Sequence, residues 1–172
     1  RRNPGAGRFV NFYYNGTDIY NDVSVNYCVH EMFAEKQADT LVIRFNDTKG
    51  IWSKWQPAAG DTVRFKEGAS DTGKMFIHSM KPENGLFTIR AMSMPKTAKI
   101  RKSKSWEGVR FLQLANEFAG NHGLTFKNYG CEDQVYPYIK QSNEGDFSLF
   151  SRLCMLEGCQ MLIFDGSLLA YN

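Results

Sequence analysis

The chain has 172 residues, of which 42% are hydrophobic and 23% are charged, and its formal net charge is +3. These proportions are typical of a folded protein with one or two domains, and a domain that coats a polyanion would usually be much more basic. No run of about 18 apolar residues occurs, so we expect no membrane segment.

The first 95 residues have the pattern of an antiparallel β structure. Apolar and polar residues alternate in short segments, and glycine-containing turns separate them. Trp52, Trp55 and Pro57 interrupt the pattern, and we expect a longer loop there. No helical periodicity is convincing in this part, so we expect a sandwich or small barrel. The six predicted strands are residues 8–14, 22–34, 40–47, 60–68, 73–80 and 85–92.

A basic segment follows Pro95. Lys96, Lys99, Arg101, Lys102 and Lys104 occur in it without an acidic residue, whereas residues 105–172 hold four basic and eight acidic residues. Nucleic-acid-binding domains usually spread basic charge over a face and interleave aromatic residues with it. We therefore predict a basic linker over 96–105 whose lysines are solvated or contact acidic groups of a neighbouring subunit; a nucleic-acid grip is the alternative.

Residues 106–172 are expected to form a small α+β domain. A first helix is predicted to begin at Ser105 as N-cap, with Trp106 packed at its entrance, and to end at Gly120 or Gly123. A second helix is predicted to begin at Asp146 and end at Gly158. A hairpin with an Asp165-Gly166 turn is expected over 160–171.

The predicted fold class is therefore α+β, with a β-barrel over 1–95, the basic linker, and an α+β domain of two helices and a β-hairpin.

Little in the sequence indicates catalysis. Cys28, Cys131, Cys154 and Cys159 form no CxxC pair, and we expect free, mostly buried thiols. His122 with Cys154 or Cys131 is a conceivable nucleophile pair, but no motif surrounds either thiol. Adjacent carboxylates at Glu132-Asp133 and at Glu144 and Asp146 are expected to cap and solubilise. We expect no catalytic residue, cofactor site or metal site.

Tryptophan is enriched at interface hot spots, but it also covers small cores. For Trp52 and Trp55 both interpretations stay open, and for Trp106 a core position is favoured. The candidate residues for a subunit or partner interface are Trp52, Trp55, Lys99, Arg101, Lys102 and Lys104.

Five segments in order resemble the late control gene D and baseplate hub superfamily of contractile-tailed phages, tailocins and related injection systems. Lys102 to Gly108 is similar to the family's passage Lys-Ser-x-Ser-Trp-Glu-Gly, and 141–153 is similar to its passage into the second helix. Residues 1–37 match only in strand pattern. The five segments are 38–63, 73–80, 85–95, 102–124 and 139–171.

This resemblance implies a structural protein without enzymatic activity. Hubs of this family are typically homotrimers whose tail-tube-like barrels form a ring that joins the tail tube to the central spike. Implied partners are a tail tube or distal tail protein, the tail spike, and baseplate wedge and tape-measure proteins, with DNA only as a translocating passenger.

The implied location is the virion tail baseplate or a tailocin particle, assembled in the bacterial cytoplasm. Family members usually continue into a second barrel, and we expect this chain to be truncated before it. A tail-associated cell-wall hydrolase or protease segment, or an OB-like nucleic-acid-binding module that uses the basic segment, are the alternatives.

Overall fold

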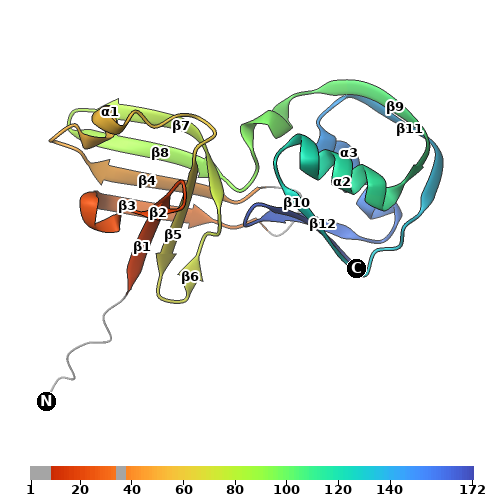
Figure 1. Ribbon diagram of the computed structural model, residues 1–172, viewed down its shortest axis with the longest axis horizontal. Coiled ribbons are helices and arrows are strands. Elements are labelled where there is room, and N and C mark those ends of the chain that lie inside the picture. The colour runs from red at the N-terminus through yellow and green to blue at the C-terminus, as the bar shows by residue number, and fades with distance from the viewer. Residues whose placement is uncertain (1–8, 34–37) are drawn as a thin grey trace, which may run out of the picture.

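The computed structural model describes residues 9–33 and 38–172, and it places them in two lobes side by side (Figure 1). The first lobe holds strands β1 to β8, and the second holds β9 to β13 with helices α2 and α3. Antiparallel strands dominate, so the α+β class is confirmed. None of the helices in the described ranges is long and apolar enough to cross a membrane.

The first lobe is one eight-stranded antiparallel sheet in the order β2-β1-β5-β7-β8-β4-β3, with β6 paired to β5. All six strands predicted from alternation are confirmed, with shifted ends. The sequence did not single out the two short strands β2 and β6. The bounds are β1 (Val10–Tyr14), β2 (Thr17–Asp18), β3 (Ser24–Glu31), β4 (Thr40–Asn46), β5 (Thr62–Glu67), β6 (Ser70–Asp71), β7 (Met75–Glu83) and β8 (Leu86–Met92).

Residues 9–33 and 38–172 show no closed barrel. The sheet ends at β2 and β3, which do not pair with each other. The two residues of β2 are both exposed, and β3 alternates only between exposed and half-buried residues. Neither edge therefore buries a row of side chains against a further strand, and the sheet is open.

A short helix replaces the loop expected between the third and fourth predicted strands. This helix is α1 (Ile51–Trp55). The lobe also holds a 3-10 turn, η1 (Tyr20–Asp22), between β2 and β3. The Asp47 carboxylate stabilises the first turn of α1, because it accepts a 2.7 Å bond from the amide of Ile51. The helix places Trp52 in the core, where its ring stacks on Phe87 at 5.2 Å between centroids.

The second lobe contains a two-stranded ribbon, two helices and a three-stranded sheet. β9 pairs antiparallel with β11, and the three-stranded sheet has the order β10-β13-β12. A 3-10 turn, η2 (Lys96–Lys99), leads into the lobe. The bounds are β9 (Lys102–Arg110), α2 (Phe111–Asn121), β10 (Thr125–Tyr129), β11 (Val135–Glu144), α3 (Asp146–Leu156), β12 (Gln160–Phe164) and β13 (Ser167–Tyr171).

The predicted helix start at Ser105 is wrong. Ser105 and Trp106 lie in β9, opposite Lys140 and Ile139 of β11. The last four residues of the predicted linker, from Lys102 to Ser105, are therefore strand. Gly108 adopts a φ of +59° inside this stretch, a conformation that interrupts a right-handed helix.

Helix α2 instead begins at Phe111 and takes its cap from elsewhere in the chain. Asp133 accepts a 3.0 Å bond from the amide of Leu112. This agrees with the capping role expected for the Glu132-Asp133 pair. The helix ends at Asn121. Gly123, one of the two predicted stops, follows with a φ of +68°, the left-handed conformation that is common just after a helix.

The second helix and the hairpin follow the prediction closely. α3 begins at Asp146, although Gly145 is the N-cap residue and the Asp146 carboxylate bonds elsewhere. β12 and β13 form the predicted hairpin, with Asp165 and Gly166 both at positive φ, as a two-residue turn of this type needs.

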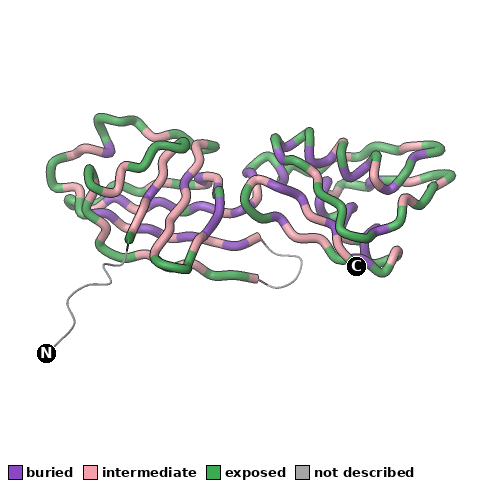
Figure 2. Tube along the Cα trace, turned by 60° about the horizontal axis from the view of Figure 1, so that its bottom comes forward, coloured by how far each residue is buried: buried purple, intermediate pink, exposed green. Residues whose placement is uncertain are grey.

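Each lobe has its own core, visible as buried segments in the middle of the strands and helices in Figure 2. Trp52, Phe12 and Phe45 are central in the first core, and Phe111, Phe118 and Phe150 in the second. The lobes also touch, because the amide of Lys74 donates a 2.8 Å bond to Asp165 of the hairpin. The division at residues 95 and 105 stays a prediction.

Candidate functional site

Four of the five basic residues of the predicted linker fall into two groups, and the fifth, Lys96, is exposed in the 3-10 turn η2. Lys102 Nζ lies 3.0 Å from Asp146 Oδ2, and Lys104 Nζ lies 2.6 Å from Glu117 Oε1. Lys104 also lies 4.8 Å above the ring of Trp106, whose indole nitrogen donates to Glu117. These two lysines therefore pair with acidic groups of their own chain.

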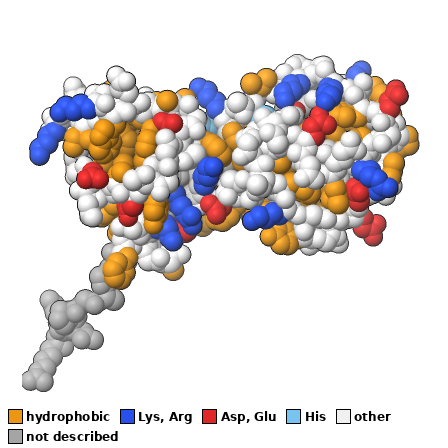
Figure 3. All heavy atoms as spheres, in the orientation of Figure 1, with side chains coloured by type: hydrophobic (Ala, Val, Ile, Leu, Met, Phe, Trp, Pro, Cys, Tyr) orange, Lys and Arg blue, Asp and Glu red, His pale blue; other side chains and the backbone are white. Residues whose placement is uncertain are grey.

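Lys99 and Arg101 differ from them, because both are exposed and neither forms an ion pair or hydrogen bond with the described part of the chain. On the face drawn in Figure 3, basic side chains are scattered over both lobes and do not form a continuous stripe. This distribution gives little support to the nucleic-acid alternative, which expects basic charge gathered on one face.

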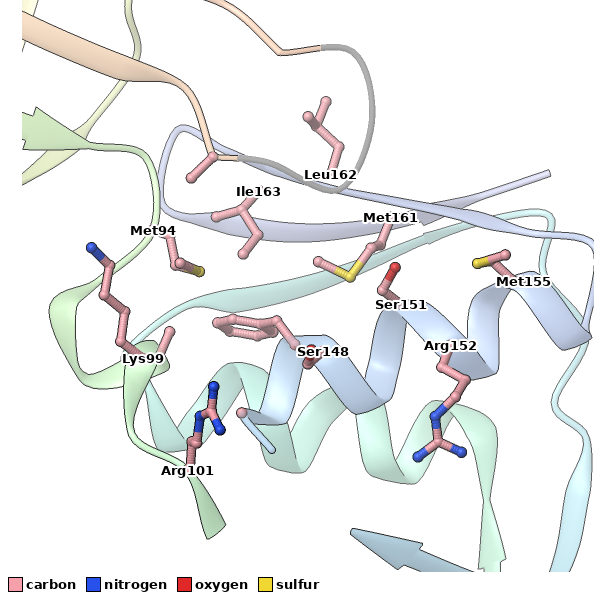
Figure 4. Close-up of a pocket in the computed structure, with 14 residues that line it drawn as sticks. Met94, Lys99, Arg101, Ser148, Ser151, Arg152, Met155, Met161, Leu162 and Ile163 are labelled. Carbon is pink, nitrogen blue, oxygen red and sulfur yellow. The ribbon is translucent and has the colours of Figure 1, made fainter. Parts of the chain in front are cut away.

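Lys99 and Arg101 line a groove of about 650 Å³ between the lobes. Ala38 and Met94 come from the first lobe, and the start of α3 and the middle of β12 come from the second. Figure 4 shows Lys99, Arg101 and Met94 at one end of the groove and Met155 toward the other. The 14 lining residues are Ala38, Met94, Ala98, Lys99, Arg101, Gly145, Phe147, Ser148, Ser151, Arg152, Met155, Met161, Leu162 and Ile163.

The groove combines an apolar floor with a cationic rim. Phe147 and Ile163 are buried in the floor, and three methionines line its sides. Among the described residues, the lining includes Lys99, Arg101 and Arg152 and no acidic residue. Arg152 is paired with Glu144 at 2.7 Å, which leaves Lys99 and Arg101 as the cations available to a ligand. The arrangement can bind an anionic group that carries apolar surface.

A buried carboxylate, Asp146, is the chain neighbour of the groove residues Gly145 and Phe147 and joins four elements. Its Oδ1 accepts from Gln141 Nε2 at 2.9 Å, and its Oδ2 is within 3.2 Å of Asn121, His122 and Lys102. Burial alone would raise the pKa of Asp146, but the bonds from Gln141, Lys102 and Asn121 outweigh burial, and the pKa lies below its usual value. Asp146 is therefore a charged residue that ties α2, β9 and β11 to the start of α3.

His122 extends this network toward the surface. Its Nδ1 lies 2.9 Å from the hydroxyl of Thr97, and its Nε2 lies 3.0 Å from Asp146. Burial lowers the pKa of His122, although Asp146 acts in the opposite direction. Because Asp146 already has donors from three other side chains and His122 is buried, we interpret the set as a structural clamp.

The Cys–His nucleophile pair that the sequence left conceivable is not formed. The two ring nitrogens of His122 bond to Thr97 and to Asp146, one each, and Cys131 and Cys154 lie in the core. Burial raises the pKa of both thiols to about 12, so neither is a thiolate at neutral pH. All four cysteines are free. Within 9–33 and 38–172, no cluster of His, Cys, Asp or Glu is arranged to hold a metal.

The two loop tryptophans have different surroundings. Trp52 is 1% exposed and lies in the first core, so a partner cannot reach it in this conformation. Trp55 is 44% exposed and packs edge-on against Trp52 at 5.3 Å. Of the predicted interface residues, Trp52 is therefore closed to a neighbour, Lys102 is partly exposed, and the exposed ones are Trp55, Lys99, Arg101 and Lys104.

The sequence did not reveal the groove or the Asp146 network. Met94, Phe147 and Ile163 meet only because the lobes pack together, and no local pattern encodes that contact. The one signal for the network was Asp146 itself, which was identified as a helix cap.

No protein-family model matches the sequence, and no curated protein matches it. Solved structures do match. The chain superimposes on the 43 kDa tail protein of prophage MuSo2 from Shewanella oneidensis, with a TM-score of 0.69 at 12% identity, over 96% of this chain and 55% of that protein.

Two further structures are similar over nearly the whole chain. The tail protein from Neisseria meningitidis MC58 has a TM-score of 0.67 at 12% identity, over 95% of this chain and 50% of that protein. The E. coli c3393 protein, a component of the type VI secretion system described as similar to the T4 bacteriophage tail proteins gp27 and gp5, has a TM-score of 0.65 at 15% identity, over 93% and 48%. The chain spans about half the length of these proteins and shares their fold.

Proposed function

We propose that this chain is a structural part of a phage-type tail baseplate, and that it acts there as a hub between the tail tube and the central spike. The observation that carries the proposal is the shared fold, over more than nine-tenths of the chain, with a prophage tail protein, a second tail protein and a type VI secretion component. The five sequence segments that resemble hub proteins lie in both lobes and occur in the family's order, which agrees with the proposal.

The ring arrangement is proposed from the edges of the first sheet. β3 is an edge strand, and Tyr27 and Val29 on it are 36% and 46% exposed. Edge strands with exposed apolar side chains are prone to pair with another chain, and a closed symmetric ring covers them. We propose that three copies associate in this way and that the first lobes together form the tube-like ring.

The role does not require catalysis. The thiols of Cys131 and Cys154 are buried and protonated at neutral pH, and His122 is engaged by Asp146 and Thr97. We therefore propose that the chain is not an enzyme and that its location is the tail of a virion or a tailocin particle.

The native mass of the protein tests the ring. Light scattering behind size exclusion, over a range of concentrations, is expected to approach three times the 19.7 kDa chain mass. Replacing Tyr27 of the β3 edge with Ser is expected to weaken the trimer, whereas Tyr138→Ser, which removes a more exposed tyrosine from β11, is not. A single-chain mass at the highest concentration would contradict the trimer.

A further inference from the structure

The groove between the lobes runs along a free strand edge. β12 pairs only with β13 among the described residues, so the amide and carbonyl groups on its other side have no ladder partner. Met161, Leu162 and Ile163, three consecutive residues of β12, all line the groove. A chain that enters the groove therefore meets unpaired backbone groups as well as side chains.

The side chains of the groove select the kind of chain that would enter. Lys99 and Arg101 lie at one end, neither forms an ion pair with a residue of 9–33 or 38–172, and none of the described residues that line the groove is a carboxylate. Met94, Met155 and Met161 line the apolar part, and methionine side chains adapt to different partner shapes. Acidic residues alternating with apolar residues in an extended segment satisfy both features.

We propose that an extended, acidic polypeptide segment of a partner protein binds in this groove as an added strand beside β12. Its backbone pairs with the free edge of β12, its carboxylates lie near Lys99 and Arg101, and its apolar side chains pack on the methionines. This mode of recognition takes affinity from main-chain hydrogen bonds and specificity from alternate side chains. The inference does not depend on the tail role, because only the groove and its charges carry it.

A nucleic acid fits these features less well. Its phosphates could reach Lys99 and Arg101, but the apolar floor contains one aromatic ring, Phe147, and that ring is buried. Single-strand binders usually stack successive bases on exposed aromatic rings. A second copy of this chain is less favoured too, because the exposed apolar residues of β3 lie on the other lobe.

Fluorescence anisotropy with the whole protein tests the proposal. The probe is a fluorescein-labelled peptide of alternating Glu and Val, compared with its Lys-Val counterpart and with the same Glu-Val peptide methylated on alternate backbone nitrogens. We expect the acidic peptide to bind at least about tenfold more tightly than either comparison peptide, and to lose affinity as salt is raised.

Two matched pairs of variants locate the binding. Lys99→Glu with Arg101→Glu is expected to weaken binding at least about tenfold. Lys127→Glu with Lys140→Glu makes the same change in charge at exposed positions outside the groove and is expected to have little effect. Met155→Ser is expected to weaken binding, and Leu156→Ser, at the next position, which is also exposed but lies outside the groove, is not.

Several results would overturn the proposal. They are equal binding of the acidic and basic peptides, equal binding of the methylated peptide, or equal effects of the groove variants and their controls. Tighter binding of a single-stranded oligonucleotide would assign the groove to nucleic acid instead. A doubling of native mass that Lys99→Glu abolishes would assign it to a second copy.

Discussion

Asp146 is the single side chain whose replacement we expect to cost most. In Asp146→Asn, Lys102 and His122 lose a charged partner inside the protein, and only 2% of the Asp146 side chain is exposed. Removing one partner of a buried ion pair costs about 3 to 5 kcal/mol, and the lower value applies here because Lys102 is partly exposed.

Urea unfolding checks this expectation. We expect the free energy of unfolding of Asp146→Asn to fall by about 3 kcal/mol. Asp22→Asn, which makes the same substitution at an exposed position, is expected to change it by less than about 0.5 kcal/mol. Equal stability of the two variants would show that the Asp146 network does not stabilise the fold.

His122 should make stability depend on pH. Its pKa in the folded state is lowered by burial, against the pull of Asp146 and with the help of Lys102. The folded state therefore binds a proton less readily than the unfolded state, in which the pKa is about 6.5. The contribution of His122 to the free energy of unfolding is therefore complete above that pH and is lost as the pH falls below it.

Melting temperatures measured between about pH 7.5 and pH 5 test this sign. We expect the melting temperature of the native protein to fall as the pH is lowered. His78, whose pKa is also lowered by burial, contributes in the same direction. A smaller decrease in His122→Gln is expected, and a slope in that variant identical to that of the native protein would contradict the assignment.

At the scale of elements, local pattern identified the segments whose alternation or turn residues fit one kind of structure only. The alternation in 40–47 and 85–92 predicted β4 and β8, and Asp165-Gly166 predicted the last hairpin. The pattern failed at β9, because residues near Ser105 also fit a helix start, whereas in the structure they pair with β11. β4 and β8 also pair with each other across a long stretch of chain, but their alternation does not fit a helix.

The turn between β6 and β7 offers a test of how the lobes touch. Gly68 and Gly73 have similar positive φ values, +59° and +64°, so replacement by Ala costs each about 1 kcal/mol of backbone strain. A Cβ at Gly68 meets nothing within 4 Å, whereas at Gly73 it lies 3.0 Å from the Cβ of Asp165 on the β12–β13 hairpin.

We expect Gly73→Ala to lower the free energy of unfolding by about 1 kcal/mol more than Gly68→Ala, because crowding is added to strain. Urea unfolding of both variants gives the comparison. Equal losses would show that the hairpin moves away from the turn without cost, and that this contact does not stabilise the pairing of the lobes.

At the scale of the whole molecule, the groove explains why the site residues were only partly foreseen. The basic segment was visible in the sequence, but Lys102 and Lys104 proved to be paired within the second lobe, while Lys99 and Arg101 face the space between lobes. Which cations stay free depends on acidic residues such as Glu117 and Asp146 that the fold brings in from elsewhere.

The two lobes have separate proposed roles in assembly. We propose that the open sheet of the first lobe contributes to a ring between subunits, and that the groove beside β12 receives a partner segment. Both proposals assign exposed strand edges to assembly, which agrees with a role as a structural part of a tail.

Gold labelling of the protein in tail-like particles tests the central claim most directly. Bacteria that make the protein with an affinity tag are lysed, the particles are isolated, and the tag is located by electron microscopy. We expect gold at one end of the tail, where a baseplate hub lies. Intact tails without label, with the tagged protein recovered only apart from the particles, would contradict the account.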